Sequence, residues 1–149
     1  MTYLIIALII AVALAPLLHF VPSKQQRAQA RLRETAALAG LFVEFRDLPG
    51  LETRAGRVSA GERQVLYYGK RLAPSKGRAK RRGVWRRKGG DWAPVGGREN
   101  PPSILNELPP QILASSIDEA SCGVYWREEG GVEMVEQIAH SLETWAQQN

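Results

Sequence analysis

The first apolar stretch of the chain is also its longest. Residues 3–21 read YLIIALIIAVALAPLLHFV and contain no charged side chain. As a helix rising about 1.5 Å per residue, this stretch covers roughly 28 Å, close to the bilayer hydrocarbon thickness of about 30 Å. Such a helix is apolar on every face, and the rest of the chain is too short to enclose it in a core. The pattern therefore predicts a transmembrane anchor over residues 1–22.

A cleaved signal peptide is the main alternative for this segment. Signal peptides begin with a positively charged region and end at a small-residue cleavage motif. Here the α-amino group is the only positive charge before the apolar stretch. The one such motif, Ala13-Leu14-Ala15, is followed by Pro16 and further apolar residues. The pattern favours an anchor that is retained.

A second helix is predicted over residues 23–40. Ser23 and Gln26 have the spacing of a capping box at its start, and Gly40 is a natural C-terminal cap. Small and apolar side chains recur along one face at helical spacing, and arginines cover much of the remainder. We interpret this segment as a basic juxtamembrane helix, which either lies against anionic headgroups or stands off the membrane as a stalk.

Several later segments alternate apolar and polar residues, as strands do. One of them contains Gly89-Gly90, which suits a two-residue hairpin turn. That turn sets a register in which Arg87 faces Trp92 across the hairpin, so an arginine–aromatic contact is expected. The predicted strand segments are residues 41–48, 64–68, 83–95 (the hairpin) and 122–128.

Residues 132–147 form the clearest amphipathic helix of the sequence, with one apolar stripe and Trp145 at its edge. A short helix is also predicted over residues 111–120, started by Pro109-Pro110. Short strands followed by a helix indicate an α+β fold. We therefore expect a domain over residues 41–149 in which a small antiparallel sheet is packed by the C-terminal amphipathic helix.

Charge is distributed unevenly along the chain. Residues 69–98 carry eleven basic side chains and one acidic, whereas residues 99–149 carry one basic and nine acidic. Within the basic part, residues 69–82 have many charges and few apolar groups. Such a composition cannot bury enough apolar surface to stay ordered, which predicts a mobile basic loop.

The strongest candidate for a binding site is the basic run beside two tryptophans. Anionic lipid is one partner, because each lysine or arginine near such a surface contributes about 1 kcal/mol. Nucleic acid is possible but less favoured, with the indoles as stacking platforms. A third interpretation is a solvated loop, partly neutralised by the acidic C-terminal part. The candidate contact residues are Lys76, Arg78, Lys80, Arg81, Arg82, Arg86, Arg87, Lys88, Trp85 and Trp92.

No catalytic signature is present in the sequence, neither a phosphate-binding glycine loop nor a nucleophile elbow. Cys122 could act as a nucleophile only with His140 beside it, and a lone cysteine at a strand start is usually an apolar filler. Glu136 and His140 share a helix face without a third ligand, so a surface ion pair is expected. Glu128 and its neighbour are expected to be solvated. We therefore predict no enzyme, no metal and no cofactor.

The charges that flank the apolar stretch predict its orientation. Four basic residues lie within residues 24–33, and no basic side chain precedes the stretch. Positive charge is retained on the cytoplasmic side of a membrane. The N-terminus is therefore expected outside and the C-terminal domain in the cytoplasm.

Residues 1–40 resemble the YajC family, the small accessory subunit of the bacterial preprotein translocase. The resemblance rests on the apolar N-terminal helix, on Pro22 at its exit and on the helix SKQQRAQARLRE. It implies a single-pass protein of the bacterial inner membrane, acting as an accessory or scaffolding subunit with a membrane-protein partner. No functional residue carries over from it. The alternative function is a membrane-tethered RNA- or ribosome-binding module.

Overall fold

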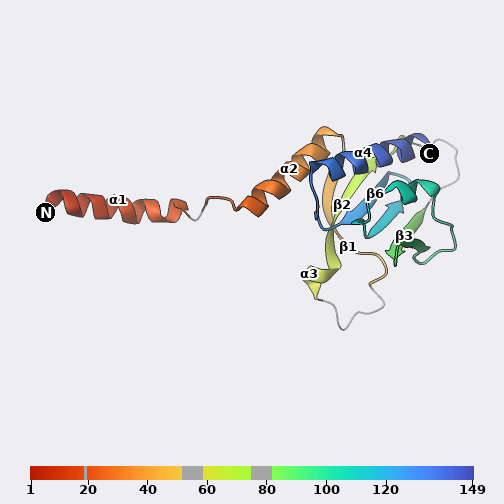
Figure 1. Cartoon of the computed structure of the whole chain (residues 1–149), viewed down its shortest axis with the longest axis horizontal. Helices are drawn as coiled ribbons and strands as arrows, with labels where there is room; N and C mark the ends of the chain where they lie inside the picture. Colours follow the sequence, from red (N-terminus) through yellow and green to blue (C-terminus); the bar gives the residue numbers. More distant parts are fainter. Residues whose placement is uncertain (19, 52–58, 75–81) are drawn as a thin grey trace. The chain divides into compact units, whose positions relative to one another are not determined.

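The computed structural model describes residues 1–18, 20–51, 59–74 and 82–149 (Figure 1). The chain divides into two compact units, Met1–Ala30 and Arg31–Asn149. The second unit therefore begins inside the predicted juxtamembrane helix rather than after it.

The first helix, α1, spans Thr2–Leu18 and contains Pro16. Its large apolar side chains are exposed on all sides, since every residue from Tyr3 to Leu17 is exposed and the large apolar ones among them are at least 48% exposed. Within the part of the chain that the structure describes, no helix is both long enough and apolar enough to cross a membrane.

The second helix, α2, spans Lys24–Leu38, as the sequence predicts. The capping box at its start is formed: the Ser23 amide donates to Gln26 Oε1 at 2.9 Å and the Gln26 amide to Ser23 Oγ at 3.2 Å. At its end, Gly40 has a φ of +75°, and the Leu41 amide donates to the Ala36 carbonyl at 2.9 Å. This left-handed cap needs glycine, because a side chain there is strained.

The Arg31–Asn149 unit is built on one antiparallel sheet of six strands in the order β1-β2-β6-β5-β3-β4. The α+β class, the antiparallel sheet and the C-terminal helix are thus confirmed. The strands are β1 Phe42–Asp47, β2 Gln64–Arg71, β3 Gly83–Lys88, β4 Asp91–Pro94, β5 Ala114–Ile117 and β6 Ser121–Trp126. The helices are α3 Ala60–Arg63, the 3₁₀ helix η2 Ser103–Glu107 and α4 Val132–Gln147.

The predicted hairpin and its register are confirmed. Arg87 faces Trp92 in the β3–β4 pair, and the Arg87 guanidinium carbon lies 4.7 Å from the centre of the Trp92 ring. Gly89 and Gly90 both have positive φ, as a two-residue turn of this kind requires.

The helix predicted over residues 111–120 is wrong, because Ala114–Ile117 forms β5 between β6 and β3. Pairing on both sides satisfies its backbone groups, and Ser115 Oγ donates to the Gly123 carbonyl at 2.9 Å. Asp118 then turns the chain, since its Oδ1 accepts the amides of Ala120 and Ser121 at 2.8 Å each. The predicted mobile loop is also too long: Gly69–Arg71 belongs to β2, and residues 75–81 lie outside the described part of the chain.

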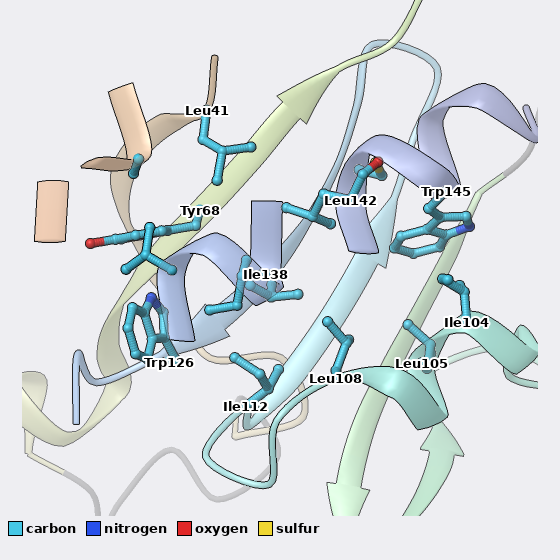
Figure 2. Close-up of a cluster of buried hydrophobic side chains, with 14 of the residues drawn as sticks. Leu41, Tyr68, Ile104, Leu105, Leu108, Ile112, Trp126, Ile138, Leu142 and Trp145 are labelled. Atoms are coloured by element: carbon cyan, nitrogen blue, oxygen red, sulfur yellow. The ribbon is translucent and has the colours of Figure 1, made fainter. Parts of the chain in front are cut away.

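The main core lies between one face of the sheet and α4. Side chains from both elements converge there, among them Tyr68, Trp126, Ile138 and Leu142 (Figure 2). Leu32 and Ala36 of α2 join the same cluster. Trp145, predicted at the edge of the helix stripe, is only 3% exposed. It belongs to the same cluster as Ile104 and Leu105 of η2, and Figure 2 shows Ile104 next to its ring.

The opposite face of the sheet carries a smaller buried cluster around Tyr67 and Tyr125. Their rings lie 4.9 Å apart between centroids, and Arg46 stacks 3.8 Å from the centre of the Tyr67 ring. Two glycines make room for the tyrosine ring: a Cβ at Gly123 would lie 2.4 Å from it, and one at Gly69 2.6 Å. We call this side the arginine–tyrosine face.

Candidate functional site

The predicted contact residues separate into three groups in the structure. Lys76, Arg78, Lys80 and Arg81 lie outside the described residues. Arg82 is exposed just before β3. The remaining candidates lie on the β3–β4 hairpin, where successive side chains point to opposite faces of the sheet.

Both tryptophans of the candidate site belong to the main core. Trp85 is 2% exposed and Trp92 is 8% exposed. Their indole nitrogens are satisfied within the chain: Trp85 Nε1 donates to the Glu99 carbonyl at 3.1 Å, and Trp92 Nε1 to the Leu105 carbonyl at 2.9 Å. In this arrangement neither ring presents a face on which a nucleic-acid base can stack.

Arg87 lies on the same side of β3 as Trp85 and serves the fold. Its Nη1 donates to the Pro109 carbonyl at 2.9 Å and its Nη2 to the Leu108 carbonyl at 3.2 Å. Burial lowers the pKa of this guanidinium. The side chain therefore stabilises the segment that leads into β5, with Nη1 and Nη2 both donating to backbone carbonyls of that segment.

Arg86 and Lys88 point to the opposite side, into a groove of about 830 Å³. Arg86 Nη1 donates to the Gly50 carbonyl at 3.3 Å, and among the described residues its other donors have no hydrogen-bond partner. Lys88 is exposed. Apolar side chains, two glycines and Arg87 provide the rest of the wall. The groove is lined by Pro49, Gly50, Leu51, Val84, Arg86, Arg87, Lys88, Pro94, Val95 and Gly96.

This groove is suited to a ligand that is both anionic and partly apolar. Arg86 supplies a planar fork of donors and Lys88 a mobile ammonium, and both recognise phosphate or carboxylate oxygens. The two valines and the prolines offer surface to an aliphatic group. Of the predicted site residues that the structure describes, Arg86, Arg87 and Lys88 line this groove, with Arg87 donating to backbone carbonyls. Both indoles are buried in the core, and Arg82 is exposed before β3.

A polar cluster that the sequence analysis missed lies at the junction of α2 and the sheet. Glu128, expected to be solvated, is 8% exposed. Arg33 donates to it twice, Nε to Oε1 and Nη2 to Oε2, both at 2.9 Å, and the Tyr68 hydroxyl donates to Oε1 at 2.7 Å. Glu128 also has a φ of +56°, an unusual conformation for a non-glycine residue.

The environment of this cluster changes the acidity of its members. Burial, followed by the hydrogen bond to Glu128, raises the pKa of Tyr68 far above its usual range. The same carboxylate, through its hydrogen bond, raises the pKa of Arg33. Tyr68 therefore stays neutral and donating, and the three groups form a closed set that ties α2 to the sheet. No local sequence signal pointed to it, because the partners are far apart in the chain.

The residues considered for chemistry are not assembled into a site. Cys122 is fully buried, its thiol points to the Leu142 carbonyl at 3.9 Å, and burial raises its pKa to about 12. His140 and Glu136 are exposed on α4. A buried neutral thiol is a poor nucleophile, since the thiolate is the reactive species. No group of three metal-ligating side chains occurs among the described residues.

Comparison of the chain with protein-family models, with curated proteins and with solved structures finds no match.

Proposed function

We propose that this protein is a membrane-attached accessory subunit whose N-terminal segment inserts into lipid and whose α+β unit works at the membrane surface. The observation that carries the proposal is α1: it has no charged side chain over Thr2–Leu18, and its apolar side chains are exposed on every face. An exposed apolar surface of this extent favours a lipid environment or a protein partner.

The length of α1 defines how it can insert. Its 17 residues make a helix of about 25 Å, shorter than a hydrocarbon core of about 30 Å. A full span therefore requires the apolar residues that follow, or local thinning of the bilayer, which costs only a fraction of a kcal/mol per Å. The basic residues from Lys24 onward then favour a cytoplasmic location for the folded unit, in a bacterial inner membrane.

An accessory role fits better than catalysis. The resemblance of residues 1–40 to a translocase accessory subunit supports an accessory role. The burial of Cys122 supports it too, because burial raises the pKa of the thiol and keeps it neutral. At the membrane surface, Arg86 and Lys88 in their groove are suited to the phosphates of anionic lipid headgroups. The RNA-binding alternative is less favoured because its stacking platforms, Trp85 and Trp92, are buried.

Fractionation of cells that produce the full chain tests the membrane attachment. We expect the protein to sediment with membranes and to resist extraction at alkaline pH, as an inserted helix does. Ile9→Arg places a charge in the middle of α1 and should release the protein. Gln25→Arg adds the same charge outside α1 and should leave it in the membrane. A parent protein that stays in the soluble fraction refutes the proposal.

Orientation and headgroup binding need two further measurements. A reporter active only in the periplasm, fused after Asn149, should be inactive. Full-chain protein in detergent micelles doped with anionic lipid should bind that lipid, and Arg86→Ser with Lys88→Ser should weaken the binding. Arg127→Ser, which removes an exposed charge elsewhere, should not. Stronger retention on RNA than on lipid would favour the nucleic-acid alternative instead.

A further inference from the structure

The first strand, β1, is an open edge of the sheet. It pairs with β2 on one side, and no strand pairs with it on the other among the described residues. In Figure 1, β1 forms the border of the sheet next to β2. An edge of this kind presents a row of backbone N–H and C=O groups that a further strand can pair with.

The two edges of this sheet differ in their protection. The other edge, β4, has only four residues and ends in Pro94, and both features are common protection against edge-to-edge pairing. By contrast, β1 has six residues, FVEFRD, with no proline and no lysine. Its two central charges, Glu44 and Arg46, form an ion pair at 2.9 Å and so neutralise each other.

An exposed aromatic ring lies in the middle of β1. Phe45 is 68% exposed, and in the described part of the Arg31–Asn149 unit the only other strongly exposed large apolar side chain is Leu38. The Arg33 guanidinium carbon lies 5.9 Å from the centre of the Phe45 ring, and most of the ring remains open to solvent. An aromatic residue in such a position gains by packing against a cross-strand partner.

We propose that β1 pairs antiparallel with β1 of a second copy of this chain, in the register centred on Phe45. In that register Phe45 faces the partner's Phe45, and Glu44 faces the partner's Arg46. The two-fold axis repeats the second contact, so both charge pairs are formed at once. This self-complementarity of FVEFRD is what selects a second copy over an unrelated strand, because an isologous interface must match its own surface.

The pairing joins two sheets into one continuous sheet and buries both Phe45 rings. Each Arg46 then lies between Glu44 of its own chain and the partner's Glu44. Opposite charges directly across antiparallel strands stabilise the pair, and like charges destabilise it. The inference does not depend on membrane attachment, although attachment of both copies to one membrane would raise their effective concentration.

Cross-linking of the full chain in detergent tests the register. Residues that face each other across antiparallel strands have Cβ atoms about 4.5–5.5 Å apart, close to disulfide range, whereas diagonal positions are about 7–8 Å apart. Phe45→Cys should therefore give a disulfide-linked dimer on mild oxidation, and Glu44→Cys much less. Asp91→Cys, exposed on the β4 edge, is the matched control and should stay monomeric. Cys122 is buried and should not contribute.

Charge variants in the Phe45→Cys background test the pairing of Glu44. Glu44→Gln removes both attractions and should lower dimer formation by about threefold, and Glu44→Arg, which sets like charges face to face, by about tenfold or more. Glu129→Arg makes the same change at an exposed site outside β1 and should have no effect.

Two results overturn the inference. One is cross-linking of Phe45→Cys that does not exceed that of Asp91→Cys. The other is Phe45→Cys cross-linking that Glu44→Arg leaves unchanged, since a dimer held together by α1 alone would be insensitive to the charge at position 44.

Discussion

Replacing Glu128 by glutamine should loosen the attachment of α2 to the sheet. Glutamine has nearly the same shape, but only one of its two terminal atoms accepts hydrogen bonds. One of the two Arg33 donors would therefore face an amide donor, and the charge that both partners bind would be lost. An amide oxygen in the place of Oε1 can still accept from Arg33 Nε and from the Tyr68 hydroxyl, so the lost hydrogen bond is the one from Arg33 Nη2.

The burial of the two partners sets the size of this effect. The Glu128 side chain is 1% exposed and the Arg33 side chain is 40% exposed. Breaking a fully buried ion pair costs about 3–5 kcal/mol, but the guanidinium here can regain water. Hydrogen bonds to charged groups contribute about 1.5–3 kcal/mol in net terms. We therefore expect Glu128→Gln to lower the free energy of unfolding by about 2–3 kcal/mol.

Urea unfolding followed by circular dichroism measures this change in a shortened chain that begins at Ser23 and so retains the α2 cap. A double-mutant cycle with Arg33→Gln should give a coupling of about 1–2 kcal/mol. Glu129→Gln, at the exposed neighbouring position, is the control and should stay within about 0.5 kcal/mol of the parent. A Glu128→Gln protein as stable as this control would refute the proposed role of the cluster.

Three further predictions concern the core. Ile138→Asp buries an unpaired charge between α4 and the sheet and should lower the free energy of unfolding by several kcal/mol. The control, Glu136→Ala at an exposed position, should change it by less than about 0.5 kcal/mol. Equal melting temperatures of the two variants would show that α4 is not docked on the sheet. Gly123→Ala places a Cβ 2.4 Å from the Tyr67 ring and should lower the free energy of unfolding by about 1–3 kcal/mol through overpacking. Gly97→Ala, whose Cβ meets no atom within 4 Å, is the control and should lower it far less when both are measured by urea titration. Because burial raises the pKa of Cys122 to about 12, the stability gained from its neutral thiol is complete below the unfolded-state pKa of about 8.5 and is lost as pH rises above it, by up to about 1.4 kcal/mol per pH unit. Urea midpoints between pH 8 and 10 should therefore fall in the parent and much less in Cys122→Ala; parallel slopes would contradict the assignment.

Where the partners lie close together in the chain, the sequence determined the structure by itself. The capping box at Ser23 and Gln26 joins groups three residues apart, and the facing of Arg87 and Trp92 follows from a two-residue turn. The helix over Val132–Gln147 follows from its apolar periodicity alone. Contacts of this range depend on local backbone geometry, which a few residues specify.

Only the tertiary structure decided which face of each strand is buried and which distant groups meet. Alternation shows that Arg86 and Arg87 point to opposite sides of β3, but the position of α4 determines that the side of Arg87 and Trp85 is the core. Residues 114–117 form a strand because β3 and β6 pair with them on both sides, which outweighs the local preference set by the two prolines. Glu128 is buried because Arg33, 95 residues away, and Tyr68, 60 residues away, both converge on its carboxylate. Local sequence carries no trace of such a pairing, because its free energy is gained only when the folded chain brings the three groups out of water together.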